Sequence, residues 1–369
     1  MSEATFIEIE GHIFDSHLFE KVLDEIRAAG ASYRIVEVQL GTSVEDTSRA
    51  RIVIEAPTGA VLVETLAAAT GHGARILTPD EIDPAHRDEL RHTPETPIAL
   101  PWGRRYAMCA PEHFGIAYEI NPWMHTEVVV DRDRAWEQWR TLVRTLEAAG
   151  ARIEQLDPIE GLPDYVFTAN AGLIDGDTFI PASFRHPQRQ GETPHAIGWF
   201  RARGYRIAPL PAGLVHEGAG DALPFNDVVI SGYRIRSDAP SHAAVARIAR
   251  AQVRAIELVD PRFYHLDITF CPLDARRAIV VPQAWDTYGQ EMMRALVPEP
   301  LVLDDDEALA FCANSVVIDR TVVMPACTPR IEQQLRAWGF EVVVVDVSEF
   351  LKAGGAVRCL TLALDVDLG

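Results

Sequence analysis

The chain has 369 residues, 48% of them apolar, and a formal net charge of −20 at pH 7. That charge argues against nucleic acid and anionic membranes as partners, because both attract surfaces rich in Lys and Arg. It favours a cationic small molecule, although acidity also serves solubility on its own. The sequence shows no run of about 18 apolar residues and no secretory leader, so we expect a cytoplasmic protein. Its five scattered cysteines fit neither a zinc site nor a disulfide scaffold, so we expect reduced thiols and no metal.

The first 80 residues alternate between strand and helix patterns in the order βαββαβ. This order predicts a small ferredoxin-like α+β domain over residues 1–80. A stretch rich in Pro, Asp, Glu and His follows and predicts a linker over residues 81–104. The expected strands are FIEIEGHIF, YRIVEVQL, RARIVIEA and ARIL, and the expected helices are LFEKVLDEIRAAG and AVLVETLAAATGHG.

An internal repeat runs through residues 105–369. Each of four segments carries a polar residue, a short apolar strand, a turn and a second strand, and a fifth polar position lies near the C-terminus. The polar positions are separated by 51, 46, 47 and 45 residues, which predicts five units. These positions are Asn170, Asp221, Asp267, Asn314 and Cys359.

Several units continue into a helix and a further strand, so each is predicted to be a ββαβ unit. We expect helices in SHAAVARIARAQVRAIELV and RIEQQLRAWG, and a strand in FEVVVVDV. The fifth unit is split. Its first strand is expected around Cys359, and INPWMHTEVVVDRD with the helix AWEQWRTLVRTLEAAG supplies the remainder. A ring closed by both chain ends, a five-bladed α/β propeller, would bring the five polar positions to one axis.

Cys359 is the candidate nucleophile at this axis. A thiolate attacks well when a cationic neighbour or a cationic substrate lowers its pKa. Gly354 and Gly355 precede it and would allow the backbone to approach a ligand closely. The other reading is that a free cysteine is a small buried apolar residue.

Two acidic motifs complete the candidate site. YHLDITF places His265 and Asp267 two residues apart, as a general acid and base beside a carboxylate. HEGAGDAL places Glu217 and Asp221 around two glycines; it lacks the third glycine of a dinucleotide-binding loop, which argues against a Rossmann domain. Carboxylates beside a thiol suit a flat cation better than a phosphate.

Together these motifs resemble the guanidino-group-modifying enzymes of the pentein fold, which include arginine deiminase, dimethylarginine dimethylaminohydrolase, agmatine deiminase and the amidinotransferases. The resemblance covers about residues 105–366. Its stretches YEINPWM, DYVFTANAGL, HPQRQGE, HEGAGDAL, YHLDITFCPL and EFLKAGGAVRCLTL are most similar to the arginine dihydrolase branch. That branch converts arginine to ornithine, carbon dioxide and two ammonia molecules.

The resemblance implies a role for each site residue and no cofactor. Cys359 is the nucleophile, His265 the general acid and base, and Glu217 and Asp267 hold the guanidinium group. The implied substrate contacts are Asn170, Asp221, Arg189 for the carboxylate and Asn121 for the other end of the substrate. Arg189 as a solvated loop residue and Asn121 as a turn former remain open readings.

Asn170 favours the dihydrolase over the deiminase. Deiminases of this family usually have Asp at this position, and Asp suits a cation and releases neutral citrulline. An amide both donates and accepts, so it can hold a neutral ureido group for a second attack. The alternatives are arginine deiminase, dimethylarginine dimethylaminohydrolase and, from another class, a non-catalytic arginine-binding module. An amidinotransferase fits fewer of the stretches.

The N-terminal domain resembles the small conserved domain of lysine-oxoglutarate reductase/saccharopine dehydrogenase-like bifunctional enzymes. In longer relatives this domain lies between the amidinohydrolase part and an ornithine-cyclodeaminase-like portion, as the resemblance implies. Here it comes first and no such portion follows, so we expect the reaction to stop at ornithine. Ferredoxin-like domains often sense amino acids or pair their sheets, so we also expect a homo-oligomer.

Overall fold

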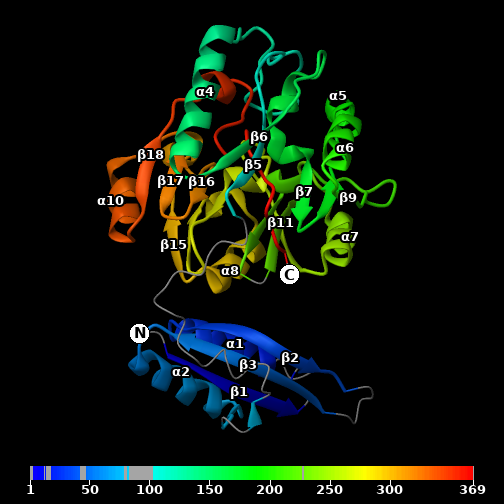
Figure 1. Ribbon diagram of the computed structural model, residues 1–369. Coiled ribbons are helices and arrows are strands. Elements are labelled where there is room, and N and C mark those ends of the chain that lie inside the picture. The colour runs from blue at the N-terminus through cyan, green and yellow to red at the C-terminus, as the bar shows by residue number, and fades with distance from the viewer. Residues whose placement is uncertain are drawn as a thin grey trace. The chain divides into compact units, whose positions relative to one another are not determined.

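The computed structural model divides the chain into two compact units, Met1–Thr96 and Pro97–Gly369, each described separately below (Figure 1). Residues 83–102, most of the predicted linker, lie outside the part of the chain that the structure describes. The described residues are 3–11, 13, 18–41, 47–78, 81–82, 103–226 and 228–368.

In its described residues, the first unit is one antiparallel sheet with two helices. The strand order β2-β3-β1-β4 and the element order confirm the predicted βαββαβ arrangement. Helix α1 buries an apolar stripe that includes Val22 and Ile26, which explains its formation next to the sheet. The elements are β1 (Glu3–Gly11), α1 (Leu18–Ala28), β2 (Ser32–Gln39), β3 (Ser48–Ala56), α2 (Gly59–Gly71) and β4 (Arg75–Ile76).

The second unit is mixed α/β, and the part of it that the structure describes contains five small sheets of three strands each. In every sheet the first two strands pair antiparallel and the third joins the second in parallel. Four sheets follow one another along the chain. They are β7 (Gly172–Asp175), β8 (Thr178–Pro181) and β9 (Arg206–Ile207); β10 (Ala222–Phe225), β11 (Val228–Tyr233) and β12 (Gln252–Glu257); β13 (Phe270–Pro272), β14 (Arg277–Val280) and β15 (Glu299–Val302); and β16 (Val316–Ile318), β17 (Thr321–Met324) and β18 (Glu341–Val344).

The fifth sheet joins the two ends of this unit, with β19 (Leu362–Ala363), β5 (Arg105–Cys109) and β6 (Arg152–Leu156). The Asp365 carboxylate anchors the junction by accepting hydrogen bonds from the backbone N–H groups of Arg104 and Arg105. The split unit and its helix are therefore as predicted, but its second strand is β5. The stretch INPWMHTEVVVDRD is instead mostly part of a loop over residues 110–131, where Asn121 and Pro122 form a turn.

One predicted helix is too long. The stretch SHAAVARIARAQVRAIELV splits into the end of α7 (Ala239–Ala249) and the strand β12. Arg250 between them adopts the left-handed conformation with φ of 53°, which ends the helix. Val253 and Ile256 then favour the strand, which pairs in parallel with β11.

The remaining helices lie around the outside of this unit, and the strands lie toward its middle (Figure 1). A single apolar cluster fills the space between them. None of the helices in the described ranges is long and apolar enough to cross a bilayer. The helices are α4 (Arg132–Ala148), α5 (Pro187–Gln190), α6 (Glu192–Ala202), α8 (Thr287–Leu296), α9 (Asp305–Leu309), α10 (Pro329–Ala337) and α11 (Ser348–Leu351).

Candidate active site

The five polar positions of the repeat occupy equivalent places in the five sheets. Each lies in a turn or a short 3-10 helix just before the first strand of its own sheet. This arrangement is why residues about 45 to 50 positions apart can meet. Asn170 lies in η4 (Thr168–Ala171) before β7, Asp221 follows η5 (Gly218–Gly220) before β10, Asp267 lies in η6 (Leu266–Ile268) before β13, Asn314 precedes β16 and Cys359 precedes β19.

Cys359 is buried and contacts two of these residues. Its Sγ lies 3.4 Å from Oδ2 of Asp267, to which the thiol donates, and 3.2 Å from Nδ2 of Asn314, which donates to the sulfur. Burial raises the pKa of the Cys359 thiol well above its ordinary value, and the Asp267 carboxylate raises it further. Without a ligand, therefore, the nucleophile candidate is a thiol at neutral pH.

Asp267 is fully buried beside that thiol. Burial raises the pKa of its carboxyl to about 7, against the attraction of the Arg358 guanidinium. Oδ1 of Asp267 has no hydrogen-bond partner within the described ranges. A carboxyl held near its titration point, with one free oxygen, can accept a hydrogen bond from an incoming cationic group.

His265 and Glu217 form a second group. His265 Nε2 lies 2.8 Å from Oε2 of Glu217, and the same oxygen accepts a hydrogen bond of 2.8 Å from Nη1 of Arg236. All three side chains are buried. Glu217 is therefore the centre of a buried ionic cluster with His265 on one side and Arg236 on the other.

In this cluster the neighbouring charges oppose the effect of burial on each pKa. Burial alone would raise the pKa of Glu217, but Arg236 and the hydrogen bond from His265 outweigh it, so its pKa lies below the ordinary value. Burial lowers the pKa of His265 to about 4, although Glu217 opposes this shift. The imidazole is therefore neutral at pH 7, as a base must be before it takes up a proton.

Arg189 is buried, which excludes the reading of a solvated loop residue. It makes a bidentate pair with Glu192, with N–O distances of 2.7 and 2.8 Å. Its Nη1 donates to Oδ1 of Asn170 at 2.8 Å, and the Asn170 amide in turn donates to the Glu217 carbonyl at 3.3 Å. The amide of Asn170 is thus fixed with its oxygen toward a guanidinium group.

A small pocket opens beside these groups. Its lining includes four residues of the predicted set: Cys359, Asn170, Arg189 and Asn121. Asn121 comes from the loop over residues 110–131. Asn121 both shapes a turn, by accepting from the N–H groups of Trp123 and Met124, and reaches Ala353 O with its amide at 3.1 Å. Both readings of Asn121 therefore fit the structure.

Two charged lining residues, Asp164 and Arg236, were missed from the sequence. Asp164 is a buried acid whose pKa is raised by burial, and it lies in the quoted stretch DYVFTANAGL. Arg236 lies two residues after Arg234 in the stretch YRIRSD, and only the structure separates them, because Arg234 pairs with Glu257 at the surface. Asp164 could have been found from the sequence, because it is an acid shortly before Asn170, the first polar position of the repeat. No such signal marked Arg236.

Asp221 is fully buried but is not among the residues that line the pocket. Its carboxylate accepts from Ser237 Oγ at 2.6 Å and from the N–H of Leu266 at 3.1 Å. Ser237 also accepts from the N–H of Glu217. Asp221 therefore ties the backbone beside Glu217 to the backbone beside His265.

The two glycines before Cys359 lie against pocket residues. Gly354 has φ of 80°, a conformation that side chains rarely adopt, and its carbonyl accepts a hydrogen bond of 2.7 Å from the Tyr264 hydroxyl. A Cβ atom on Gly355 would lie 2.2 Å from the ring of Phe167. Both positions therefore need glycine for close packing at the pocket wall.

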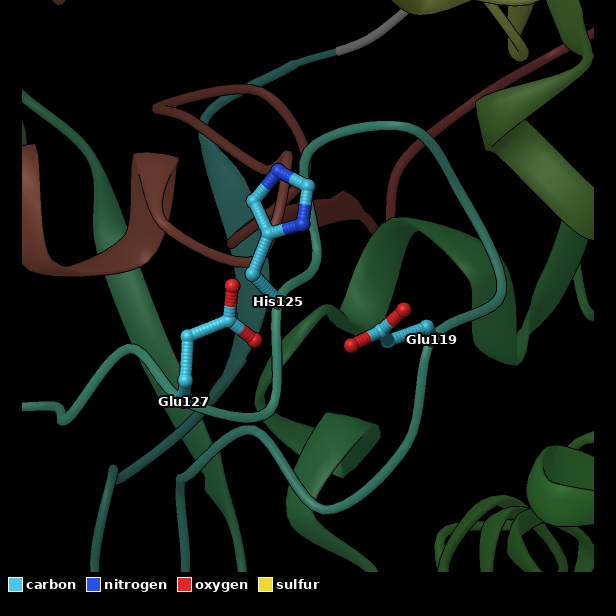
Figure 2. A group of neighbouring side chains, drawn as sticks. All are labelled: Glu119, His125 and Glu127. Carbon is cyan, nitrogen blue, oxygen red and sulfur yellow. The ribbon is translucent and has the colours of Figure 1, made fainter.

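A separate group of potential metal ligands lies on the same loop as Asn121. Figure 2 shows Glu119, His125 and Glu127 gathered there, with ligand atoms within 4.8 Å of one another. All three are exposed, and Glu119 already accepts two hydrogen bonds from Thr126. None of them belongs to the predicted site, and their proximity alone assigns them no function.

Comparison with known proteins matches both units. The family described as the LOR/SDH bifunctional enzyme conserved region matches residues 4–96. A dimethylarginine dimethylaminohydrolase from Mycobacterium tuberculosis is 42% identical over 274 residues, which are 74% of this chain and 88% of that protein. The bifunctional arginine dihydrolase/ornithine cyclodeaminase AgrE from a Nostoc species is 40% identical over 70% of this chain, but over only 37% of its own length.

A solved structure is similar over the same region. It is the N-terminal domain of ArgZ, an arginine dihydrolase of the cyanobacterial ornithine-ammonia cycle, crystallised as a mutant with substrate. Its TM-score is 0.70 and its identity 36%, over 72% of this chain and 99% of that one. These matches confirm both resemblances seen in the sequence. The chain therefore belongs to the family of guanidino-group-modifying enzymes that includes dimethylarginine dimethylaminohydrolase and arginine dihydrolase, with an LOR/SDH conserved region at residues 4–96.

Proposed function

We propose that the chain is an arginine dihydrolase, which hydrolyses arginine with two waters to ornithine, carbon dioxide and two ammonia molecules. The observation that carries the proposal is the meeting of the Cys359 thiol with Asp267, two residues from His265, beside the pocket. The proposal is supported by the similarity to AgrE and to ArgZ, the latter also solved with its product and, as a variant, with a covalent intermediate.

In the proposed complex the carboxylates of Glu217 and Asp267 hold the substrate guanidinium group. Charge-assisted pairs of this kind fix both the position and the plane of the guanidinium carbon. At the other end of the substrate, Arg189 and Arg236 supply positive charge for the carboxylate, and Asp164 and Asn121 supply acceptors for the amino group. Arg189, Asp164 and Asn121 line the pocket together, which supports this orientation.

The cationic substrate is proposed to activate the nucleophile. In the free protein the thiol donates to Asp267 and its pKa is high. A guanidinium group next to the sulfur favours the thiolate, and it also draws Asp267 into an ion pair. The thiolate then attacks the guanidinium carbon and gives a tetrahedral adduct.

His265 is proposed to move the protons of the following steps. It first takes up the proton that the Cys359 thiol loses when the thiolate forms. As an imidazolium it passes this proton to the departing ammonia, which leaves a thiouronium intermediate on Cys359. As neutral imidazole it then deprotonates the water that attacks this intermediate. Glu217, at 2.8 Å, stabilises the imidazolium whenever it forms.

Asn170 is the proposed reason for a second round. Its oxygen accepts from Arg189 and its amide donates to a backbone carbonyl, so the group is neutral and held in one orientation. Unlike a carboxylate, a neutral amide does not bind a guanidinium cation in preference to a neutral ureido group. The ureido product of the first round can therefore stay in the site for a second attack. That attack releases the second ammonia, and hydrolysis yields ornithine and carbon dioxide.

The test is a product balance for purified protein incubated with arginine. We expect ornithine and ammonia in a 1:2 ratio with no accumulation of citrulline, and no turnover after Cys359→Ser. Citrulline that accumulates without ornithine would identify a deiminase instead. Arginine binding without any product, in the unmodified protein, would identify a binding module.

Dimethylarginine is the second candidate substrate, because the Mycobacterium tuberculosis relative named above is a dimethylarginine dimethylaminohydrolase. The same thiol chemistry would then release dimethylamine and citrulline in one round. Dimethylarginine and arginine should be offered in parallel. A higher kcat/KM for dimethylarginine, with dimethylamine as the product, would select this candidate.

We further propose that the five sheets are the blades of a five-bladed propeller of the pentein type. The equivalent strand pairing of all five sheets and the closure of the fifth by both chain ends support this arrangement. The homo-oligomer and the cytoplasmic location expected from the sequence stay predictions. Sedimentation of the full chain and of a variant lacking residues 1–95 would test the first.

A further inference from the structure

We propose that Asn314 is a catalytic residue, whose side-chain amide stabilises the Cys359 thiolate. This inference rests on the proposed function for its meaning in the reaction, but the contacts that carry it are independent of the substrate. Asn314 is fully buried, and its Nδ2 donates to Sγ of Cys359 at 3.2 Å. A hydrogen bond to a charged acceptor is stronger than one to a neutral acceptor, so this donor favours the thiolate over the thiol.

The other contacts of Asn314 fix the direction of that donor. Oδ1 accepts from the backbone N–H of Arg358 at 3.0 Å and from that of Cys359 at 3.3 Å. Nδ2 also donates to the carbonyl of Asp267 at 3.1 Å. A flipped amide would point its NH2 group at two N–H donors and its oxygen at a carbonyl, so the observed orientation is the one that the network allows.

The chemistry of the reaction explains why the Cys359 N–H can be used in this way. In acyl transfer, the backbone N–H of the nucleophile often stabilises an oxyanion in the tetrahedral adduct. In the first round, attack of the thiolate on a guanidinium cation cancels charge and forms no oxyanion. In that round the N–H groups of Arg358 and Cys359 are not needed for an oxyanion, and they hold Oδ1 of Asn314, which aims the amide at the sulfur.

Asn314 and Asp267 act on the sulfur in opposite directions. The S–H group donates to Oδ2 of Asp267, and that bond is lost when the thiol ionises, whereas the bond from Asn314 is strengthened. The carboxylate raises the pKa of the thiol and the hydrogen bond from Asn314 lowers it. The pair keeps the resting thiol protonated and leaves one donor ready for the thiolate when a cation arrives.

The test measures the reactivity of Cys359 without substrate. Full-length Asn314→Ser and Asn314→Asp are alkylated with iodoacetamide between pH 6 and pH 10, and the rate at Cys359 is followed by peptide mass spectrometry. The lost hydrogen bond should raise the thiol pKa by about one to two units. Because a more basic thiolate is also more nucleophilic, the rate should fall roughly three- to twentyfold at each pH below the pKa. Asn314→Asp should show the larger fall, since it adds a negative charge.

The matched control is Ser315→Ala, the next residue in the same turn, whose buried hydroxyl donates to the Cys312 carbonyl. It should alkylate at the rate of the unmodified protein. Equal rates for Asn314→Ser and the unmodified protein at every pH would overturn the assignment. A second measurement covers variants that fail to fold: in the unmodified protein the Asn314 side-chain N–H resonance should shift as Cys359 titrates. No such shift would equally overturn the assignment.

These results separate the assignment from the proposed function. Unmodified protein that makes neither ornithine nor citrulline, together with slower alkylation of the Asn314 variants, removes the function and keeps the assignment. Turnover of arginine with unchanged alkylation of the variants does the reverse.

Discussion

Glu217 and Asp267, two buried carboxylates of the site, differ in charge state although neither is exposed to solvent. Glu217 lies between His265 and Arg236, and its pKa is held below the ordinary value. Asp267 lies beside the Cys359 thiol and the Asn314 amide, and burial raises the pKa of its carboxyl to about 7. The comparison teaches that burial alone does not set the protonation state here; the charged groups within hydrogen-bonding distance do.

The two sides of the site are therefore prepared for different tasks. The Glu217 side is an ionic cluster that exists before substrate arrives, so it can orient the imidazole and the substrate without rearrangement. The Asp267 side holds a carboxyl near its titration point beside a protonated thiol, and an arriving cation favours the ionised form of both. Substitutions on the two sides should therefore have different effects on activity, thiol reactivity and stability.

Replacement of Cys359, the proposed nucleophile, should have the largest effect. Cys359→Ser leaves both carboxylates in place but removes the thiolate, so ornithine formation should fall by a factor on the order of 10⁴ or more. The matched control is Cys327→Ser, a half-buried cysteine that does not line the pocket and should leave activity unchanged. Residual activity within tenfold of the unmodified protein would remove Cys359 from the mechanism.

Glu217→Gln should damage both activity and stability. It leaves the Arg236 guanidinium buried without its counter-ion, which costs about 3–5 kcal/mol of unfolding free energy. Loss of the partner of His265 should lower kcat by roughly 10²- to 10⁴-fold. Urea titration and ornithine formation check the two effects.

Glu307→Gln is the control for Glu217→Gln. Glu307 is also buried and paired with an arginine, Arg330, but it does not line the pocket. It should lose stability while its turnover per folded molecule stays near that of the unmodified protein. Equal losses of activity in both variants would show that stability, not the cluster at His265, limits turnover.

Asp267→Asn should lower activity less, by about 10²-fold, because one of the two proposed guanidinium acceptors is lost. Its effect on the thiol has the opposite sign to that of the Asn314 variants. Removing the carboxylate lowers the pKa of Cys359, so alkylation by iodoacetamide should become faster. Asp274→Asn, which alters a carboxylate at the other end of the same sheet, should leave the alkylation rate unchanged. Slower alkylation of Asp267→Asn than of the unmodified protein would show that the carboxylate does not raise the pKa of Cys359.

The smallest effect is on the pH dependence of stability. The folded-state pKa of Asp267, about 7, is above its unfolded value, so the folded state binds the extra proton between pH 4 and 7. This contribution is fully present below the unfolded pKa and is lost as pH rises through the folded pKa. Between pH 5 and pH 7.5 the unmodified protein should therefore lose up to about 3 kcal/mol of unfolding free energy relative to Asp267→Asn. A parallel pair of curves would contradict the raised pKa.

The sequence predicted most of the fold because its patterns are local. The βαββαβ order of the first unit and the spacing of the five polar positions both follow from short apolar segments at regular distances. The errors occur where a local pattern is ambiguous. The segment from Gln252 to Glu257 continues an alanine-rich helix, and only its pairing with β11 makes it a strand. Residues 120–130 look strand-like, but they lie mostly outside regular structure.

Which residues meet at the candidate site was predictable where a repeat or a motif marked them. Cys359, His265, Glu217 and Asn170 stand at such places. Arg236 was not predictable, because nothing in RIR shows which arginine turns inward. The orientation of Asn314 was equally hidden, since it depends on two N–H groups 44 and 45 positions later in the chain.

The closing of the fifth sheet has a consequence for synthesis of the protein. β19 pairs with β5, and the residues after Cys359 anchor the strand that was made some 250 residues earlier. On the ribosome, Glu217, His265 and Asp267 are added to the nascent chain well before Cys359. The proposed reactive centre therefore cannot assemble until translation has passed residue 359 and this segment has left the exit tunnel.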